Sequence, residues 1–186
     1  MSLHSLLDLD ERISAKMRVA EKPGILRTIA VILAHSGDSW FWAVGLIALW
    51  ASGDSFWRKW AVMQFFGICV LAVLVLCVKF IVKRERPEGE WGGIYRSTDP
   101  HSFPSGHAAR AFLIATIGWA LGPEWLAVIL MIWAPLVAIA RVAMGVHYLS
   151  DVLAGTLLGI VSALIGLQIY EPFLMWLQNL TGLILW

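Results

Sequence analysis

Long apolar segments separated by short polar breaks run through most of the chain. Mainly apolar stretches cover residues 60–82, 125–143 and 152–170, each close to the roughly 20 residues that a helix needs to cross a bilayer. A shorter apolar segment at 108–121 is followed by Gly-Pro-Glu at 122–124, a tight turn typical of antiparallel helices. The pattern predicts a helix for each segment and an all-α membrane protein.

Two further apolar segments, 25–34 and 40–51, are separated by the polar tetrapeptide at 35–38. Each is shorter than a membrane span, so the first can dip into the membrane, lie on it, or cross at a tilt. We interpret His35 and Asp38 in the break as marking a helix boundary. Of these alternatives we favour two short passes over 25–51, which brings the number of crossings to six.

The two ends of the chain differ from this middle part. Residues 1–24 mix charged side chains with leucines, which is typical of an amphipathic helix at the membrane interface. Residues 171–186 form an apolar tail, either interfacial or a further partial crossing. We therefore predict one domain over 1–186, with a polytopic bundle of about six (five to six) transmembrane helices over 25–170.

The composition supports a membrane protein. Hydrophobic residues make up 59% of the chain and charged residues 15%, with eleven Trp and a mean hydropathy of +0.75, whereas soluble domains average about 25% charged. A net charge of +1 argues against a nucleic-acid partner. Cys69 and Cys77 are eight residues apart, about 12 Å along a helix, too far for a disulfide.

Glycines at 155, 159 and 166 recur along one predicted spanning helix. Small residues at such spacings let helix backbones approach closely in a membrane. We therefore expect the helix over 152–170 to pack tightly against a neighbour.

Polar residues that are remote in sequence fall on one membrane face if the chain changes sides at each crossing. That face receives the segments 79–107 and 141–151. Lys79 and Arg86 are two helical turns apart and point the same way. His147 and Asp151 are at i and i+4, within hydrogen-bonding reach if that turn is helical.

The segment 104–107, Pro-Ser-Gly-His, begins an apolar helix on the same face. Pro104 cannot continue a preceding helix, Ser105 can cap the new one, and the unpaired N–H groups of the first turn attract an anion. Gly106 lets a ligand approach the backbone, and His107 can hold a proton beside it.

Each of these clusters also has a purely structural interpretation. Basic side chains at helix ends extend to lipid headgroups, and a His with an Asp can simply cap a helix. The combination is more informative, because charges near lipid are costly to retain without a function. Together the clusters indicate a phosphate site with a nucleophile, an acid and an orienting carboxylate.

The three motifs, at 79–87, 104–107 and 141–151, resemble the signature of the type-2 phosphatidic acid phosphatase superfamily in order and spacing. The resemblance covers residues 40–170. One position departs from it, since Ala140 stands where the family usually has Ser, which removes one hydroxyl donor near the phosphate.

The resemblance implies a role for each motif residue. His147 would attack phosphorus to form a phosphohistidine, with Asp151 fixing its tautomer, and His107 would protonate the leaving oxygen and then activate water. The phosphoryl oxygens would be held by Lys79, Arg86, Ser105, Gly106 and Arg141. No metal or cofactor is implied. His101, six residues before His107, is interpreted as a surface or substrate-edge residue.

Three functions follow from this site. The first is hydrolysis of a lipid phosphate or pyrophosphate, for which undecaprenyl pyrophosphate, phosphatidylglycerol phosphate and phosphatidic acid are all suitable. The second is phosphoryl transfer from a lipid pyrophosphate to another acceptor, and the third is non-catalytic lipid binding. The oligomeric state stays open.

The resemblance also implies a location in the plasma (inner) membrane with an extracytoplasmic active site. The positive-inside rule does not decide the side, because basic residues of the motifs themselves confound it. With six crossings, the N-terminus would lie in the cytoplasm, opposite the active site.

Overall fold

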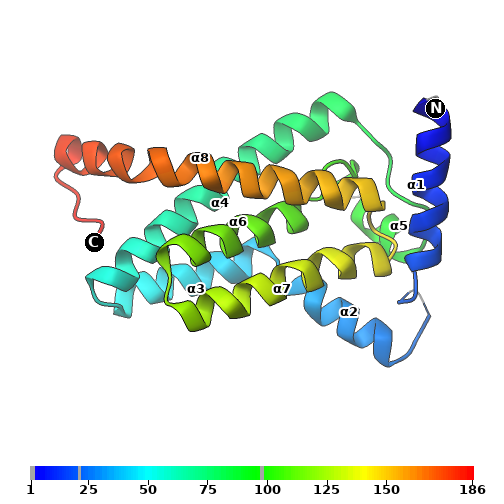
Figure 1. Cartoon of the computed structure of the whole chain (residues 1–186), viewed down its shortest axis with the longest axis horizontal. Coiled ribbons are helices and arrows are strands. Elements are labelled where there is room, and N and C mark those ends of the chain that lie inside the picture. The colour runs from blue at the N-terminus through cyan, green and yellow to red at the C-terminus, as the bar shows by residue number, and fades with distance from the viewer. Residues whose placement is uncertain (1–2, 21, 97–98) are drawn as a thin grey trace.

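The computed structural model describes the whole chain except residues 1–2, 21 and 97–98. Over these residues the fold is a bundle of eight helices with no strand, and Figure 1 shows their arrangement. The helices are α1 (Leu3–Met17), α2 (Ile25–His35), α3 (Ser39–Ser52), α4 (Ser55–Val82), α5 (Glu90–Arg96), α6 (Gly106–Leu121), α7 (Glu124–Ala143) and α8 (Leu149–Thr181). The expected all-α fold is confirmed.

Helix α6 is the centre of the bundle and packs against α4, α7 and α8. Its small side chains make this possible, since Ala108, Ala109, Ala111 and Ala115 are fully buried. Larger buried residues of α6, such as Leu113 and Ile117, join the main core cluster with residues of α4. The helix that starts with the Ser-Gly-His motif is therefore the most enclosed one.

Two of the three predicted glycines on α8 allow α6 and α8 to approach closely. A Cβ at Gly155 would lie 2.4 Å from the Ser105 carbonyl oxygen, and one at Gly159 would lie 2.1 Å from that of Ala109. Gly166 differs, because its Cβ would meet the ring of Tyr170 on its own helix at 2.3 Å. The close helix contact is thus confirmed at the first two positions.

Three helices, α4, α7 and α8, are long and apolar enough to cross a membrane. Helices α2 and α3 pass the same test only as a pair, bent by 53° at the polar break. In Figure 1 the two helices continue toward opposite ends of the bundle instead of doubling back. Neither helix of the pair is long enough for a pass of its own by this test, and the expected count of six spans, with two passes over 25–51, is not confirmed.

Helix α8 is longer than the sequence indicates. It continues beyond Tyr170 through Pro172 to Thr181, so most of the expected tail is helical. Proline is tolerated inside membrane helices because neighbouring groups satisfy the backbone that it frees. The chain then turns at Gly182 and folds back, and the Leu185 carbonyl accepts a hydrogen bond from the Trp50 indole at 2.6 Å.

Helix α1 lies against the end of the bundle that carries the three motifs (Figure 1). The Asp10 carboxylate accepts hydrogen bonds from the Ser150 N–H at 3.0 Å and from Arg84 at 2.7 Å, and Ser14 accepts one from Leu149 N–H at 2.8 Å. The N-terminal helix and the motifs therefore share one end. This contradicts the expectation that they lie on opposite sides of the membrane.

Candidate active site

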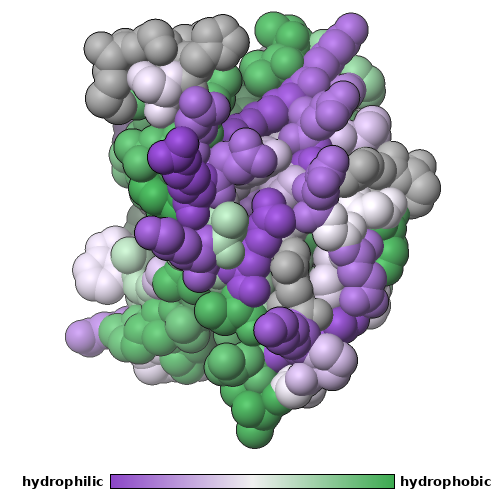
Figure 2. Space-filling model, turned by 90° about the vertical axis from the view of Figure 1, so that its right-hand side faces the viewer, coloured by the Kyte–Doolittle hydropathy of each residue, from purple (hydrophilic) through white to green (hydrophobic). Residues whose placement is uncertain are grey.

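The three motifs meet at one end of the bundle, around a cavity of about 220 Å³. Figure 2 shows hydrophilic side chains gathered over this end of the molecule. The polar residues that line the cavity are Lys79, Asp99, His107, Arg110, Arg141 and His147, together with the backbone of Gly106. Apolar residues of α4 continue the wall toward the membrane interior: Ile68, Leu71, Ala72, Val75 and Leu76.

His147 and Asp151 form the innermost pair of the site. His147 lies in the turn between α7 and α8, Asp151 lies in the first turn of α8, and both are at most 2% exposed. The distance from His147 Nδ1 to Asp151 Oδ2 is 3.5 Å, and the other ring nitrogen, Nε2, is 3.3 Å from a guanidinium nitrogen of Arg86. The imidazole is thus placed between a carboxylate and a cation.

The expected phosphate ligands Lys79 and Arg86 hold a carboxylate instead. Lys79 Nζ and Arg86 Nη2 each lie 2.7 Å from Oδ2 of Asp99 in the loop between α5 and α6. Asp99 is the most exposed member of this cluster, with 42% of its side chain accessible. Two cations in this cavity thus bind one negatively charged oxygen. A phosphoryl oxygen of a substrate would require the same contacts.

The Ser-Gly-His motif begins α6, as predicted, and Ser105 occupies the N-cap position, but its side chain makes no capping hydrogen bond. Ser105 is extended, its N–H donates to the Asp151 carbonyl at 2.9 Å, and its hydroxyl is buried without a hydrogen-bond partner among the described residues. Gly106 and His107 line the cavity, whereas Ser105 does not. The predicted helix start is thus confirmed without a side-chain cap, and the Ser105 backbone joins α6 to α8.

An acidic residue that the sequence did not assign to the site contacts His107. Asp38, in the break between α2 and α3, accepts a hydrogen bond on Oδ1 from His107 Nε2 at 2.7 Å. Its Oδ2 lies 3.0 Å from His35 Nδ1. The sequence did show an acidic residue in a polar break between apolar segments. We interpreted that residue only as marking a helix boundary.

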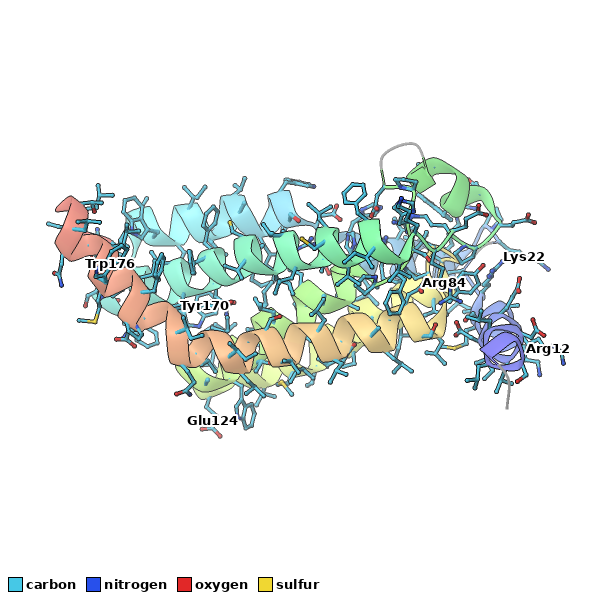
Figure 3. The ribbon with its side chains drawn as sticks, turned by 90° about the horizontal axis from the view of Figure 1, so that it is seen from above. Arg12, Lys22, Arg84, Glu124, Tyr170 and Trp176 are labelled. Atoms are coloured by element: carbon cyan, nitrogen blue, oxygen red, sulfur yellow. The ribbon has the colours of Figure 1, made fainter. Side chains whose placement is uncertain are left out.

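Arg84 is a second residue that the sequence analysis missed. It lies between Lys79 and Arg86 in the chain, yet it points to the other side and donates to Asp151 Oδ1 and to Asp10 at 2.7 Å each. Its guanidinium also covers the ring of Tyr148, 3.9 Å from the centroid. It connects α1 to the carboxylate beside His147 and is labelled at this end of Figure 3.

The surroundings of His147 determine its charge. Burial lowers the pKa of the imidazole well below its ordinary value, and the positive charges of Arg86, Arg141 and Lys79 lower it further. The ring is therefore neutral at physiological pH, the form in which a ring nitrogen has a free electron pair. Within the described parts of the chain, no three His, Cys, Asp or Glu side chains are grouped to hold a metal ion.

Comparison with known proteins agrees with this arrangement. The model of the PAP2 superfamily matches residues 60–174, which contain all three motifs. The chain belongs to the PAP2 superfamily. It is 30% identical to the probable lipid phosphate phosphatase beta of Arabidopsis thaliana, over 88% of this chain and 89% of the relative.

Other PAP2 proteins resemble this chain to a similar degree. A decaprenylphosphoryl-5-phosphoribose phosphatase of Mycobacterium tuberculosis is 33% identical over 79% of this chain and 81% of its own. The crystal structure of a PAP2-type phosphatidylglycerolphosphate phosphatase from Bacillus subtilis superposes with a TM-score of 0.73 at 23% identity, over 90% of this chain and 87% of that one. Aquifex aeolicus LpxE gives a TM-score of 0.66 at 26% identity, over 83% and 93%. The predicted family and class, a membrane phosphatase of lipid phosphates, are confirmed.

Proposed function

We propose that this PAP2 protein hydrolyses a lipid phosphate or lipid diphosphate through a phosphohistidine on His147. The observation that carries the proposal is the buried pair of His147 and Asp151, which opens onto a cavity lined by Lys79, Arg141 and His107. A neutral imidazole oriented by a carboxylate is an activated nucleophile, and the cations stabilise the charge of a transferring phosphoryl group.

In the first step, His147 Nε2 attacks phosphorus. A nitrogen–phosphorus bond forms while the bond from phosphorus to the leaving lipid oxygen breaks, and His107 delivers a proton to that oxygen. Asp151 holds the Nδ1 proton of His147 and balances the positive charge that the ring acquires. The separation of 3.5 Å shortens as that charge develops.

In the second step, a water molecule attacks the phosphohistidine. His107 takes a proton from the water, an oxygen–phosphorus bond forms, and the nitrogen–phosphorus bond breaks to release inorganic phosphate. Asp38 keeps His107 in position for both steps, since its carboxylate binds Nε2 at 2.7 Å and leaves Nδ1 for proton transfer.

The phosphoryl oxygens are bound by side-chain cations and by the start of α6. Lys79, Arg86 and Arg141 supply the positive charge, and the N–H groups beside Ser105 and Gly106 supply a helix N-terminus. A bound phosphate replaces the Asp99 carboxylate on Lys79 and Arg86, because two carboxylate oxygens offer less charge than a phosphate.

The lipid chain of the substrate follows the apolar wall that α4 contributes to the cavity. This wall begins beside Lys79 and continues to Ile68, about three helical turns toward the bilayer interior. Relatives named above are a probable lipid phosphate phosphatase and a decaprenylphosphoryl-5-phosphoribose phosphatase, which supports a lipid substrate.

Phosphate release by the purified protein in detergent tests this function. We expect release from lipid phosphates without any added acceptor, in the presence of excess EDTA, and inhibition by vanadate, which mimics five-coordinate phosphorus. His147→Gln should reduce the rate by at least about 10³-fold, as loss of a nucleophile does, while the variant elutes as a folded protein. Rapid transfer with slow hydrolysis would indicate a phosphotransferase, and activity of the variant within a few-fold of wild type would exclude the phosphohistidine.

We place the protein in the plasma (inner) membrane. The family resemblance implied an extracytoplasmic active site, which with six crossings left the N-terminus on the opposite side, whereas α1 lies at the same end as the cavity. The basic residues of α1 therefore add to the number of basic residues at the catalytic end. Under the positive-inside rule this supports a catalytic end that faces the cytoplasm.

A further inference from the structure

A cation outside the three motifs lines the same cavity. Arg110 follows His107 by three residues on α6, so it lies on the same face of the helix and one turn deeper in the bundle. Its guanidinium donates a hydrogen bond to the carbonyl oxygen of Gly37 in the break between α2 and α3. The proposed mechanism on one phosphate gives this side chain no role.

Arg110 differs from the other cations of the site in its partners. Lys79 and Arg86 share the carboxylate of Asp99, and Arg84 binds the carboxylates of Asp10 and Asp151. Over the described parts of the chain, no carboxylate lies within salt-bridge distance of Arg110, and the negative charge that acts on it is that of Asp38, whose two oxygens are bound by His107 and His35. A guanidinium beside the apolar wall of α4 is costly unless an anion accompanies it, so its position indicates an anionic ligand.

The geometry of the proposed reaction decides which anion that is. The proposed reaction requires the phosphorus to lie between His147, which attacks it, and the N-terminus of α6, which binds its oxygens, and it requires the leaving oxygen to lie at His107, which protonates it. The remainder of the substrate continues from that oxygen toward Val75 and Leu71 on α4. The group attached to the leaving oxygen is therefore next to Arg110.

We propose that Arg110 binds the lipid-attached phosphate of a lipid diphosphate, which makes diphosphates the preferred substrate class. This inference rests on the proposed function. His147 Nε2 bonds to the terminal phosphorus while the bridging oxygen departs with the bonding electrons as part of a lipid monophosphate. Arg110 stabilises the negative charge that develops on this leaving phosphate, a role for which a guanidinium fork is well suited.

A pair of substrates with the same chain tests the proposal: farnesyl diphosphate and farnesyl monophosphate. We expect wild-type protein to have the higher kcat/KM on the diphosphate. Arg110→Gln should lower kcat/KM about 10- to 100-fold on the diphosphate and less than about threefold on the monophosphate, the range for losing one charged hydrogen-bonding partner. Arg110→Lys, which keeps the charge, should retain most of the preference.

Two controls separate a binding role from a structural one. Lys16→Gln removes an exposed cation of α1 that lies outside the cavity and should change neither substrate. Inorganic pyrophosphate should bind wild type more tightly than inorganic phosphate does in a calorimetric titration, and Arg110→Gln should remove that difference without any turnover being measured.

Each other outcome overturns the proposal. Equal losses on both substrates would assign Arg110 to the fold or to the reacting phosphate, and no loss on either would remove it from binding. If wild type has the same kcat/KM on the monophosphate and on the diphosphate, the proposed function stands and the preference for diphosphates is wrong. Failure to hydrolyse either substrate overturns the proposed function and this inference together.

Discussion

At the scale of single residues, the site is built from pairs of buried side chains. The sequence had led us to expect these side chains at a membrane surface. His147 was expected on a membrane surface, yet only 2% of it is exposed, and Asp151 beside it is fully buried. Burial keeps the imidazole neutral, and the carboxylate is satisfied by Arg84 and by the Tyr148 N–H. The nucleophile proposed here is therefore prepared by desolvation as well as by its carboxylate.

The lowered pKa of His147 predicts a pH dependence of stability. In the unfolded chain this imidazole titrates near pH 6.5, whereas the folded protein binds the proton only well below that value. Below about pH 6.5 the unfolded state therefore takes up more protons, so the free energy of unfolding falls as the pH falls. Between pH 7.5 and 5.5, the melting temperature of wild type should decrease more steeply than that of His147→Gln. Parallel profiles would show that the ring is not held neutral.

Asp38 predicts a positioning effect on His107. Asp38→Asn keeps the size of the side chain but removes the charge that binds Nε2–H at 2.7 Å. We expect kcat to fall about 10- to 100-fold, part of the contribution of a general acid–base, with KM changed less than threefold. The pH dependence of kcat should shift as well, which a merely structural role would not produce. Asp54→Asn, at the far end of the bundle, serves as the control, and an unchanged pH profile in Asp38→Asn would exclude the role.

At the scale of elements, the contact between α6 and α8 positions the motif residues. α6 carries Gly106 and His107, α8 carries Asp151, and the two backbones touch at Gly155 and Gly159. The Ser105 N–H also donates to the Asp151 carbonyl at 2.9 Å. Movement between these helices thus separates the two histidines of the proposed reaction.

A methyl group at Gly159 should disturb this contact. In Gly159→Ala the Cβ would lie 2.1 Å from the Ala109 carbonyl oxygen, which is rigid backbone, so α6 must shift. We expect a lower melting temperature and at least a tenfold loss of kcat/KM. Gly45→Ala on α3 is the matched control, because its Cβ meets nothing within 4 Å and alanine favours a helix. Equal behaviour of the two variants would contradict the packing argument.

At the scale of the whole molecule, helix α1 lies at one end and the turn between α3 and α4 at the other (Figures 1 and 3). The cavity lined by Lys79, His107 and His147 is at the end of α1. Arg58 and Lys59 belong to the far end, and the other twelve of the fourteen Lys and Arg residues lie at the catalytic end or close to it. The exposed leucines of α1, Leu6, Leu7 and Leu9, are directed away from the bundle core. That α1 is the interfacial amphipathic helix expected from the sequence stays a prediction.

Cysteine labelling should therefore place the catalytic end in the cytoplasm. In a Cys-free background, a thiol at Ser55 should react with an impermeant reagent in intact cells, whereas a thiol at Gly93 should react only after permeabilisation. Gly93 suits this purpose because a side chain there meets nothing within 4 Å, whereas one at Gly92 would lie 2.2 Å from the Pro87 carbonyl oxygen. The reverse pattern would restore the extracytoplasmic site that the family resemblance implies.

Much of this protein was predictable from the order of its residues. Long apolar segments predict spanning helices because lipid leaves the backbone no other way to satisfy its polar groups. The motifs at 79–87, 104–107 and 141–151 identify the family because the residues of each are close together in the chain. Gly155 and Gly159 were also predictable, since the need for small residues depends mainly on their own helix.

Other features depend on contacts between distant parts of the chain, and only the tertiary structure decides them. Asp38 reaches His107, and Asp10 reaches Arg84, across about 70 residues of sequence. The course of α2 and α3, and with it the end at which α1 lies, depends on how the 53° bend packs against α7. The sequence alone determined that the chain is an all-helical membrane protein and which motifs identify its family. Packing decided which charges the residues of those motifs meet, because the partner of a buried charge is set by proximity in space.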